Sequence, residues 1–388
     1  MKPRRNCTGP EKRVDKRVSG SFSTKNVALF GFLILAYFIA ARLGVALALV
    51  QPYATPIWFP AGGAVVAFLL FGYRVWPAVF LGSFLGHLST SGFIALTFVV
   101  PIGATIEGLL GAYLVNKFAN GINAFDTAKG VFLFVLFACI CAPSLNAAVG
   151  VGVNYFGGHS TLTASLYPVL TWWLAHSIGI LLVAPFLVLS FRASHHRMNL
   201  REFAELTILL VGLLFVCMLV FGPLSVTWNS DQVIRAWLCV PFLIWAAFRF
   251  CPLEAAGTTM ILFGTAIWGT LHGYGSFVSK NLTTSLVLLD SFVGVIGTMT
   301  LVVAAMVVER RRFEEELLGV HSLLHAEVEG KGRQLADTVQ ALEVEVAVHS
   351  ETKKSLRANQ ERLELMTEET KGERSSQTAQ TPRKRHEP

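Results

Sequence analysis

Long apolar runs fill the chain between Asn26 and Val308, whereas both flanks are polar. Ten of these runs are long enough, or nearly so, to cross a hydrocarbon core about 30 Å thick. The second, third and eighth runs are short, so a count of eight spans also fits. Because hydrocarbon accepts only backbone that satisfies its own hydrogen bonds, the pattern predicts an all-α, polytopic membrane helical bundle. The runs cover residues 26–50, 57–72, 75–90, 93–116, 130–153, 163–190, 204–227, 235–250, 253–271 and 284–308.

A charged, helix-prone segment follows the last apolar run and extends from Glu309 to about Lys371. Its apolar residues recur mostly at steps of three and four, which places them along one side of a helix. This spacing predicts a cytoplasmic coiled coil and, through it, a homodimer. Residues 372–388 are polar and have no apolar pattern, which predicts a disordered tail. The coiled-coil seam consists of Phe313, Leu317, Val320, Leu324, Val328, Leu335, Val339, Leu342, Val346, Leu356 and Leu363.

Basic residues give the bundle an orientation. With a cytoplasmic N-terminus, the inner loops contain seven Lys and Arg residues and the outer loops contain two, Arg235 and Lys280. This excess predicts that both termini are cytoplasmic. The net charge of +7 is spread over the basic tail of residues 1–25, the loops and the segment after Val308, which favours contact with membrane lipids over nucleic acid. The predicted domains are therefore the N-terminal tail (1–25), a transmembrane domain (26–308), a coiled-coil helix (309–371) and the final tail (372–388).

Ionisable side chains inside a bilayer are costly, so each needs a physical reason. Glu107 lies near the middle of its run with no charge in helical reach. It is either a structural hydrogen-bond partner between helices or a ligand or proton site. Arg42, His87 and Asp290 lie closer to the ends of their runs, where we expect their side chains to reach water.

His176 lies one helical turn after two tryptophans, Trp172 and Trp173. These three side chains either line a pocket, or the tryptophans belong to a belt at the outer membrane interface, where indole rings are favoured. The belt is the interpretation that the sequence favours. The chain has no phosphate-binding Gly-rich loop with Lys, no HExxH and no GxSxG motif, so we predict no catalytic residue, metal site or cofactor.

Five sequence blocks are spaced along the apolar part of the chain. They are Trp58–Gly63, Phe71–Pro77 with Leu81–Gly82, Glu107–Tyr113, Trp172–Pro185 and Ile267–Gly275. The blocks and their order resemble the first type of bacterial membrane-associated sensor domain, the MASE family. The resemblance covers roughly Val27 to Arg312 and implies a sensory domain in the bacterial plasma (inner) membrane whose ligand is mostly undefined. The candidate ligand or polar-network residues are Glu107, His176, Trp172, Trp173, Trp58, Pro60, Tyr73, Arg74, Trp76, Trp268 and His272.

In that family the membrane domain precedes histidine-kinase, diguanylate-cyclase or PAS modules, and the segment after Val308 resembles the helical linker that leads into PAS. We therefore expect a signal-transduction module, as in two-component systems, that relays ligand or partner binding through its last span to the coiled coil. We expect no enzymatic output in this chain, and a separate signalling protein as its partner. The alternative is a secondary transporter or channel that uses Glu107, which the ten runs and their Gly and Pro interruptions favour.

The predicted topology places Gly158 outside the membrane. An alkaline phosphatase fusion after Gly158 should therefore be active, and a green fluorescent protein fusion there should stay dark. A fusion after Lys129, in a predicted inner loop, should give the opposite result. A cytoplasmic reporter at Gly158 would contradict the topology.

Overall fold

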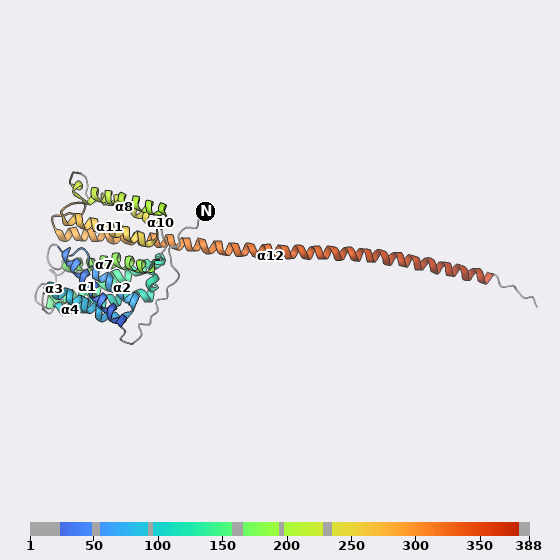
Figure 1. Ribbon diagram of the computed structural model, residues 1–388, viewed down its shortest axis with the longest axis horizontal. Helices are drawn as coiled ribbons and strands as arrows, with labels where there is room; N and C mark the ends of the chain where they lie inside the picture. Colours follow the sequence, from blue (N-terminus) through green and yellow to red (C-terminus); the bar gives the residue numbers. More distant parts are fainter. Residues whose placement is uncertain are drawn as a thin grey trace, which may run out of the picture. The chain divides into compact units, whose positions relative to one another are not determined.

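The computed structural model describes residues 24–48, 55–91, 96–156, 166–193, 198–227 and 235–379, and all regular structure in these residues is helical (Figure 1). It confirms the predicted all-α helical bundle, because every predicted run contains a helix. The elements are α1 (Thr24–Ala46), α2 (Phe59–Phe71), η1 (Tyr73–Val75), α3 (Trp76–Ser91), α4 (Leu96–Phe118), η2 (Gly121–Asp126), α5 (Ala128–Phe134), η3 (Val135–Cys141), α6 (Ala142–Phe156), α7 (Leu166–Arg192), α8 (Leu200–Phe221), η4 (Pro223–Thr227), η5 (Ala236–Cys239), α10 (Val240–Arg249), α11 (Pro252–Leu271) and α12 (Leu282–Ala379).

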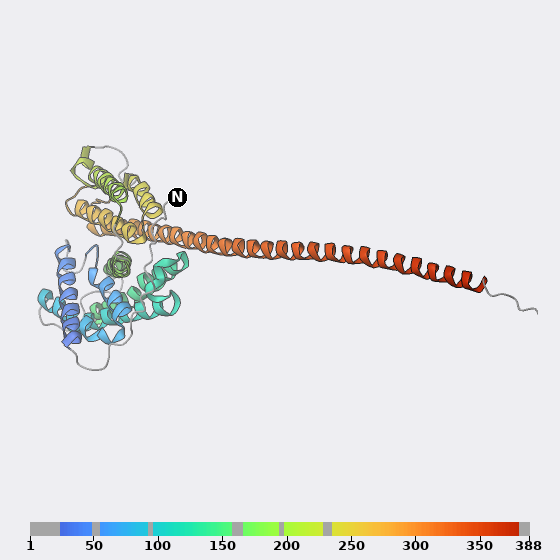
Figure 2. The ribbon, with the colours of Figure 1, turned by 45° about the vertical axis from the view of Figure 1, so that its right-hand side comes forward.

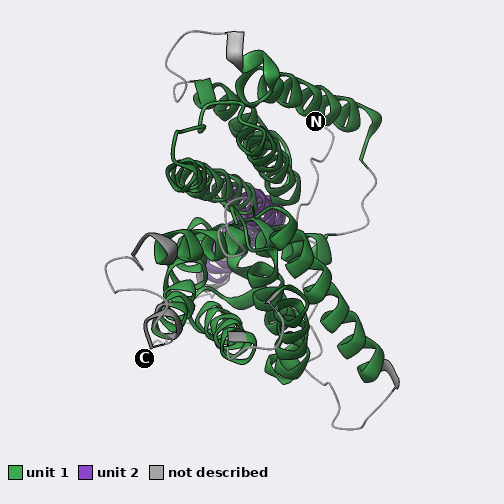
Figure 3. Cartoon of the chain, turned by 90° about the vertical axis from the view of Figure 1, so that its left-hand side faces the viewer, with its two compact units in different colours: residues 1–312 green, residues 313–388 purple. Residues whose placement is uncertain are grey.

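The chain divides into two compact units, residues 1–312 and 313–388 (Figure 3). The first part of α12 belongs to the helical bundle, and the rest of α12 makes up the described part of the second unit (Figure 2). In the second unit, the apolar side chains of the predicted seam are exposed. Helix α12 continues to Ala379 and so includes the first residues of the predicted tail, and the disorder of that tail stays a prediction. Residues 380–388 lie outside the described part.

Among the described residues, six helices are both long and apolar enough to cross a membrane. The number of spans, ten or eight, stays a prediction. Helix α2, for example, has 13 residues and is about 20 Å long at 1.5 Å per residue. The six segments are Asn26–Ala46, Thr97–Phe118, Ala128–Gly150, Val169–Arg192, Leu200–Phe221 and Leu282–Gly372.

The short helix α2 is the buried centre of the bundle. It packs against α7, α4 and α1, and its residues from Ala64 to Leu70 are all buried. A helix that is apolar on every side must be enclosed by other helices. Pro60 lies in its first turn, where a missing N–H costs nothing. Gly72, with φ of 81°, ends it by donating its N–H to Phe68 O.

Glycines let the helices around α2 approach closely. A Cβ on Gly179 of α7 would lie 2.1 Å from Trp58 O, and a Cβ on Gly62 of α2 would lie 2.5 Å from Gly179 O. On the other side of α2, a Cβ on Gly108 of α4 would lie 2.9 Å from Ala64 Cβ. All these residues except Ala64, which directly follows its block, come from three of the blocks that the sequence singles out, so the blocks meet at one packing centre.

One expectation about charged residues is wrong. Asp290 is only 1% exposed, so its side chain does not reach water. Helix α12 begins at Leu282, which places Asp290 more than two turns inside it. Position along a run was a poor guide because packing against neighbouring helices buries this face of α12, as it also buries Leu286, Leu289 and Val293.

The close approach of α2 and α7 generates a test with adjacent glycines. We expect Gly62→Ala to destabilise the protein by about 1–3 kcal/mol, because its Cβ would overlap Gly179 O and Val183 Cβ. Gly63 has nothing within 4 Å of such a Cβ, so Gly63→Ala should be neutral or stabilise α2 by up to about 1 kcal/mol. Thermal unfolding of the purified protein in detergent measures both. Equal effects of the two substitutions would contradict the packing.

Candidate functional site

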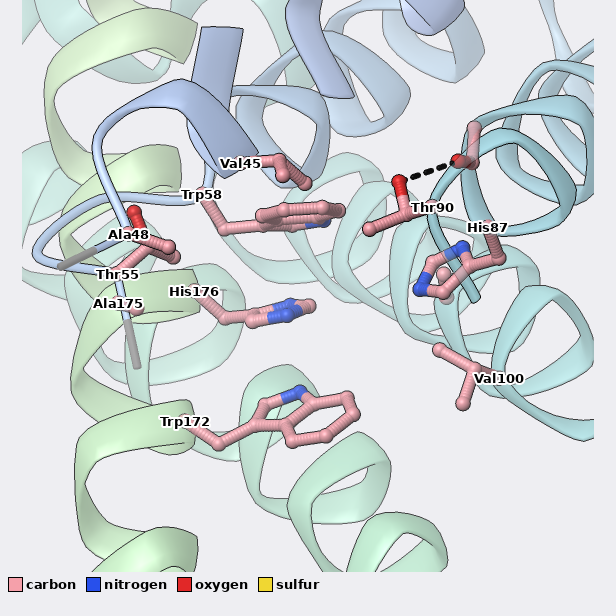
Figure 4. A pocket seen from close by; sticks show the side chains of 12 residues that line it. Val45, Ala48, Thr55, Trp58, His87, Thr90, Val100, Trp172, Ala175 and His176 are labelled. Carbon is pink, nitrogen blue, oxygen red and sulfur yellow. Dashed lines mark hydrogen bonds between the residues drawn. The ribbon is translucent and has the colours of Figure 1, made fainter. Parts of the chain in front are cut away.

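A pocket lies where α1 and α3 end and where α4 and α7 begin (Figure 4). The segment before α2 closes one side of it. Thr55 Oγ1 donates to Gly44 O at 3.0 Å and to Ile57 O at 3.1 Å, and Trp58 N donates to Ala175 O at 2.9 Å. These bonds fix Trp58 against α7. The lining residues are Val45, Ala48, Thr55, Trp58, Gly86, His87, Thr90, Val100, Ala104, Trp172, Ala175 and His176.

The imidazole of His176 is sandwiched between two indoles (Figure 4). Its centroid is 6.0 Å from that of Trp58, with an interplanar angle of 18°, and 5.9 Å from that of Trp172, with an angle of 21°. Trp172 and His176 are four residues apart on α7 and therefore share one face. The structure thus places Trp172 in a pocket wall. Trp173 lies elsewhere, and its Nε1 donates to Ile140 O at 3.2 Å.

Behind His176 lies a buried polar triad from three helices. His176 Nδ1 is 2.8 Å from Glu107 Oε2 and 3.1 Å from Oε1. Asn146 Nδ2 donates to Glu107 Oε2 at 2.6 Å. Glu107 and Asn146 are each 1% exposed and His176 is 5% exposed. A carboxylate so deeply buried needs donors or a counter-charge, and Asn146 and His176 provide the donors.

The hydrogen bonds also orient both pocket histidines. A carboxylate and a carbonyl oxygen can only accept, so the imidazole nitrogen facing each of them carries the proton. His176 Nδ1 faces Glu107, and His87 Nδ1 lies 2.9 Å from Ser83 O. In both rings Nε2 is therefore left for other partners. His87 is half-buried in the pocket wall beside Trp58, at a centroid distance of 6.0 Å, and its expected contact with water stays a prediction.

Of the candidate residues, the structure brings together Trp58, Glu107, Trp172 and His176, with Pro60 next to Trp58 at the start of α2. Asn146 was missed in the sequence. The available signal was an amide inside an otherwise apolar run, in Ser144-Leu-Asn146.

The remaining candidates lie apart from the pocket. Tyr73, Arg74 and Trp76 are exposed at the turn between α2 and α3. Trp268, in the last turn of α11, and His272, which caps its C-terminal end, form their own pair, with ring centroids 4.8 Å apart and His272 Nδ1 2.8 Å from Trp268 O. The five sequence blocks therefore did not identify which of their residues lie together at the pocket.

A second polar cluster, here called the Asp126 network, lies at the opposite helix ends. Arg192, in the last turn of α7, donates to both oxygens of Asp126, at 2.9 and 2.8 Å. Arg312 Nη2 of α12 lies 3.2 Å from Asp126 Oδ2. Glu309 of α12 accepts the N–H of Ala128 at 3.2 Å, at the start of α5. Bidentate Arg–carboxylate pairs are among the stronger polar contacts, so the network ties α12 to η2, α5 and α7.

Comparison with known proteins agrees with the resemblance found in the sequence. The sequence model of the MASE1 family matches residues 29–311. The probable diguanylate cyclase DgcE of Escherichia coli (strain K12) is 27% identical over 208 residues, which are 52% of this chain and 17% of DgcE. The chain thus spans a small part of that relative's length. No solved structure matches.

The triad predicts strong coupling between Glu107 and His176. Glu107→Leu and His176→Phe should each destabilise the protein by about 3–5 kcal/mol, because each leaves a buried polar partner unpaired. The double variant should cost clearly less than the sum, since it leaves no such partner and keeps an aromatic ring between the indoles. Thermal unfolding of the unaltered protein, both single variants and the double variant measures this double-mutant cycle.

The exposed hydrogen bond from Asn116 Nδ2 to Tyr73 Oη, at 3.0 Å, provides the control. The cycle of Asn116→Ala and Tyr73→Phe should be additive within about 0.5 kcal/mol. Additivity at Glu107 and His176 would show that the two side chains do not depend on each other.

Proposed function

Because the chain belongs to the MASE1 family of membrane sensor domains, we propose that it binds a small ligand in the pocket and relays this binding through α12 to a cytoplasmic coiled coil. The observation that carries the proposal is the polar triad at the pocket wall. Glu107, Asn146 and His176 are joined by hydrogen bonds, and the imidazole of His176 lies between two indoles. Buried polar networks are costly, and such a network beside a cavity supports a binding role.

A free donor in the pocket wall adds support. Trp172 Nε1 is buried and has no hydrogen-bond partner among the described residues. Buried polar groups are nearly always paired, so a ligand or water is the expected partner. With the N-terminus in the cytoplasm, α1 and α3 end on the outer side and α4 and α7 begin there. The proposed ligand therefore enters from outside the plasma membrane.

The proposed relay uses α7 and α12. Trp172 and His176 lie near the start of α7, and Arg192 of the Asp126 network lies in its last turn. Between these ends α7 packs on α12, where Cβ atoms on Gly294 and Gly297 would lie 3.5 and 3.4 Å from side-chain atoms of Ile178 and Leu181. A ligand that binds one arrangement of these helices more tightly shifts their populations. The contact between Asp126 and Arg312 then changes.

The proposed output is a change in pairing of the coiled coil. Its seam is exposed in a single chain, as for Leu317 and Leu324, and a second copy of the chain would cover it. We propose a homodimer that acts on a separate signalling protein, through a PAS-type linker as the family resemblance implies. DgcE is described as a diguanylate cyclase, so a cyclase or kinase module of a two-component or related pathway is the kind of partner to test.

A secondary transporter or channel is the second candidate. Glu107 at 1% exposure favours it, because carboxylates inside membranes often serve as proton or ion sites. Substrate uptake into proteoliposomes that is abolished by Glu107→Gln would support transport. The Asp126 network and the exposed seam have no evident role in that mechanism.

The relay predicts that Asp126→Asn changes coiled-coil pairing without any ligand. Single cysteines placed from Leu317 to Leu342, in a chain lacking its native cysteines, report pairing by crosslinking in membrane vesicles. Loss of the Asp126 carboxylate should change the relative crosslinking yields of these positions by about fivefold or more. That factor corresponds to the low end of usual coupling free energies.

Glu205→Gln is the matched control, since it breaks the pair of Glu205 with Arg249, 2.6 Å apart, between α8 and α10. It should leave the crosslinks unchanged. The relay is wrong if Asp126→Asn behaves like Glu205→Gln, and the homodimer is wrong if no position crosslinks.

A further inference from the structure

The pocket has an acidic side chain behind its wall and no Lys or Arg in its lining. His87 and His176 are the ionisable residues among those that line it. Directly behind His176 lies the carboxyl group of Glu107, 2.8 Å from His176 Nδ1, and its other partner, Asn146, carries no formal charge. The two donors satisfy its hydrogen bonds, but a buried carboxylate is also stabilised by a nearby positive charge. A cation next to His176 would compensate it, in place of a proton on the imidazole.

The hydrogen-bonding groups also favour a ligand that donates. The Nδ1 atoms of His87 and His176 are occupied by Ser83 O and Glu107. In its neutral form, each imidazole then has an acceptor lone pair at Nε2. Figure 4 shows the far nitrogen of His87 directed into the space between His87 and His176. Two such acceptors suit an ammonium group, which has several donors.

The walls favour an organic cation over a metal ion. Val45, Val100 and Ala104 supply apolar surface for an alkyl or aryl group, and Trp58 and Trp172 supply π systems. Indole rings attract ammonium groups, more strongly where water is excluded. In the part of the chain that the structure describes, no group of three or more His, Cys, Asp or Glu is placed to hold a metal ion.

We infer that the pocket takes a small organic cation, a protonated amine with an apolar substituent, whose ammonium group donates to the Nε2 atoms of His87 and His176. The inference rests on the proposed function for its biological meaning. Trp172 Nε1 can donate to an acceptor elsewhere on the same ligand.

The test compares four probes on the purified full chain in lipid nanodiscs: butylammonium, 1-pentanol, pentanoate and Zn²⁺. Binding is followed by tryptophan fluorescence, with Trp58→Phe and Trp172→Phe to assign the signal to the pocket. Butylammonium should bind at least about tenfold more tightly than the neutral and anionic probes of similar size, in line with a desolvated cation–π contact. Glu107→Gln should abolish this preference, and Glu205→Gln, which removes a carboxylate at the other helix ends, should retain it.

The inference is overturned if pentanol or pentanoate binds as tightly as butylammonium, if Zn²⁺ displaces butylammonium from the pocket, or if Glu107→Gln keeps the preference. If Glu107→Gln does not fold, the four probes on the unaltered protein still test whether the pocket prefers a cation. Crosslinking along Leu317–Leu342 separates this failure from failure of the proposed function. A neutral or anionic probe that binds and changes the crosslinks refutes the ligand class alone, whereas bound butylammonium that leaves them unchanged refutes the sensory relay alone.

Discussion

The contact between the start of α2 and the middle of α7 determines the rest of the bundle. Trp58 donates its N–H to Ala175 O, and Gly62 and Gly179 leave no room for a single additional carbon. Membrane helices gain little from burying apolar surface against one another, because lipid is equally apolar, so close approach of small residues must supply the packing energy. This contact encloses the short helix α2 and brings the indole of Trp58 over His176. The pocket is therefore a consequence of the packing and not an addition to it.

The buried triad has a different physical basis. In an apolar interior a carboxylate is tolerated only with donors or a counter-charge, and Glu107 obtains its donors from two other helices. Such a group penalises every arrangement of α4, α6 and α7 in which the donors are lost. It thereby selects one packing among the many that smooth apolar surfaces would allow. For the proposed ligand, the same demand is a physical reason why a change of charge beside His176 would alter the packing of these helices.

The sequence predicts the helices well because a membrane-spanning run has a minimum length and composition, and each run indeed contains a helix. It also identifies Glu107 and His176, since ionisable residues are conspicuous inside apolar runs. It does not show which face of a helix meets which neighbour, because runs that are apolar on all sides carry no directional signal. For that reason the sequence favoured the membrane interface for Trp172 and gave no place in the site to Asn146. Asp126 was not singled out in the sequence, and Arg192 entered only as one of the seven basic residues of the inner loops.

The two polar clusters lie at opposite ends of α7, and this arrangement has a mechanical consequence. Helix α7 has 27 residues and contains Pro185 between the two clusters, so in the proposed relay a displacement at Trp172 and His176 would have to pass this proline before it reaches Arg192. Arg192 holds Asp126 with two hydrogen bonds, whereas Arg312 contacts one oxygen of the same carboxylate at 3.2 Å. The weaker of the two contacts is thus the one to α12. In the proposed relay, the contact with Arg312 is therefore the first that a displacement of α7 would break.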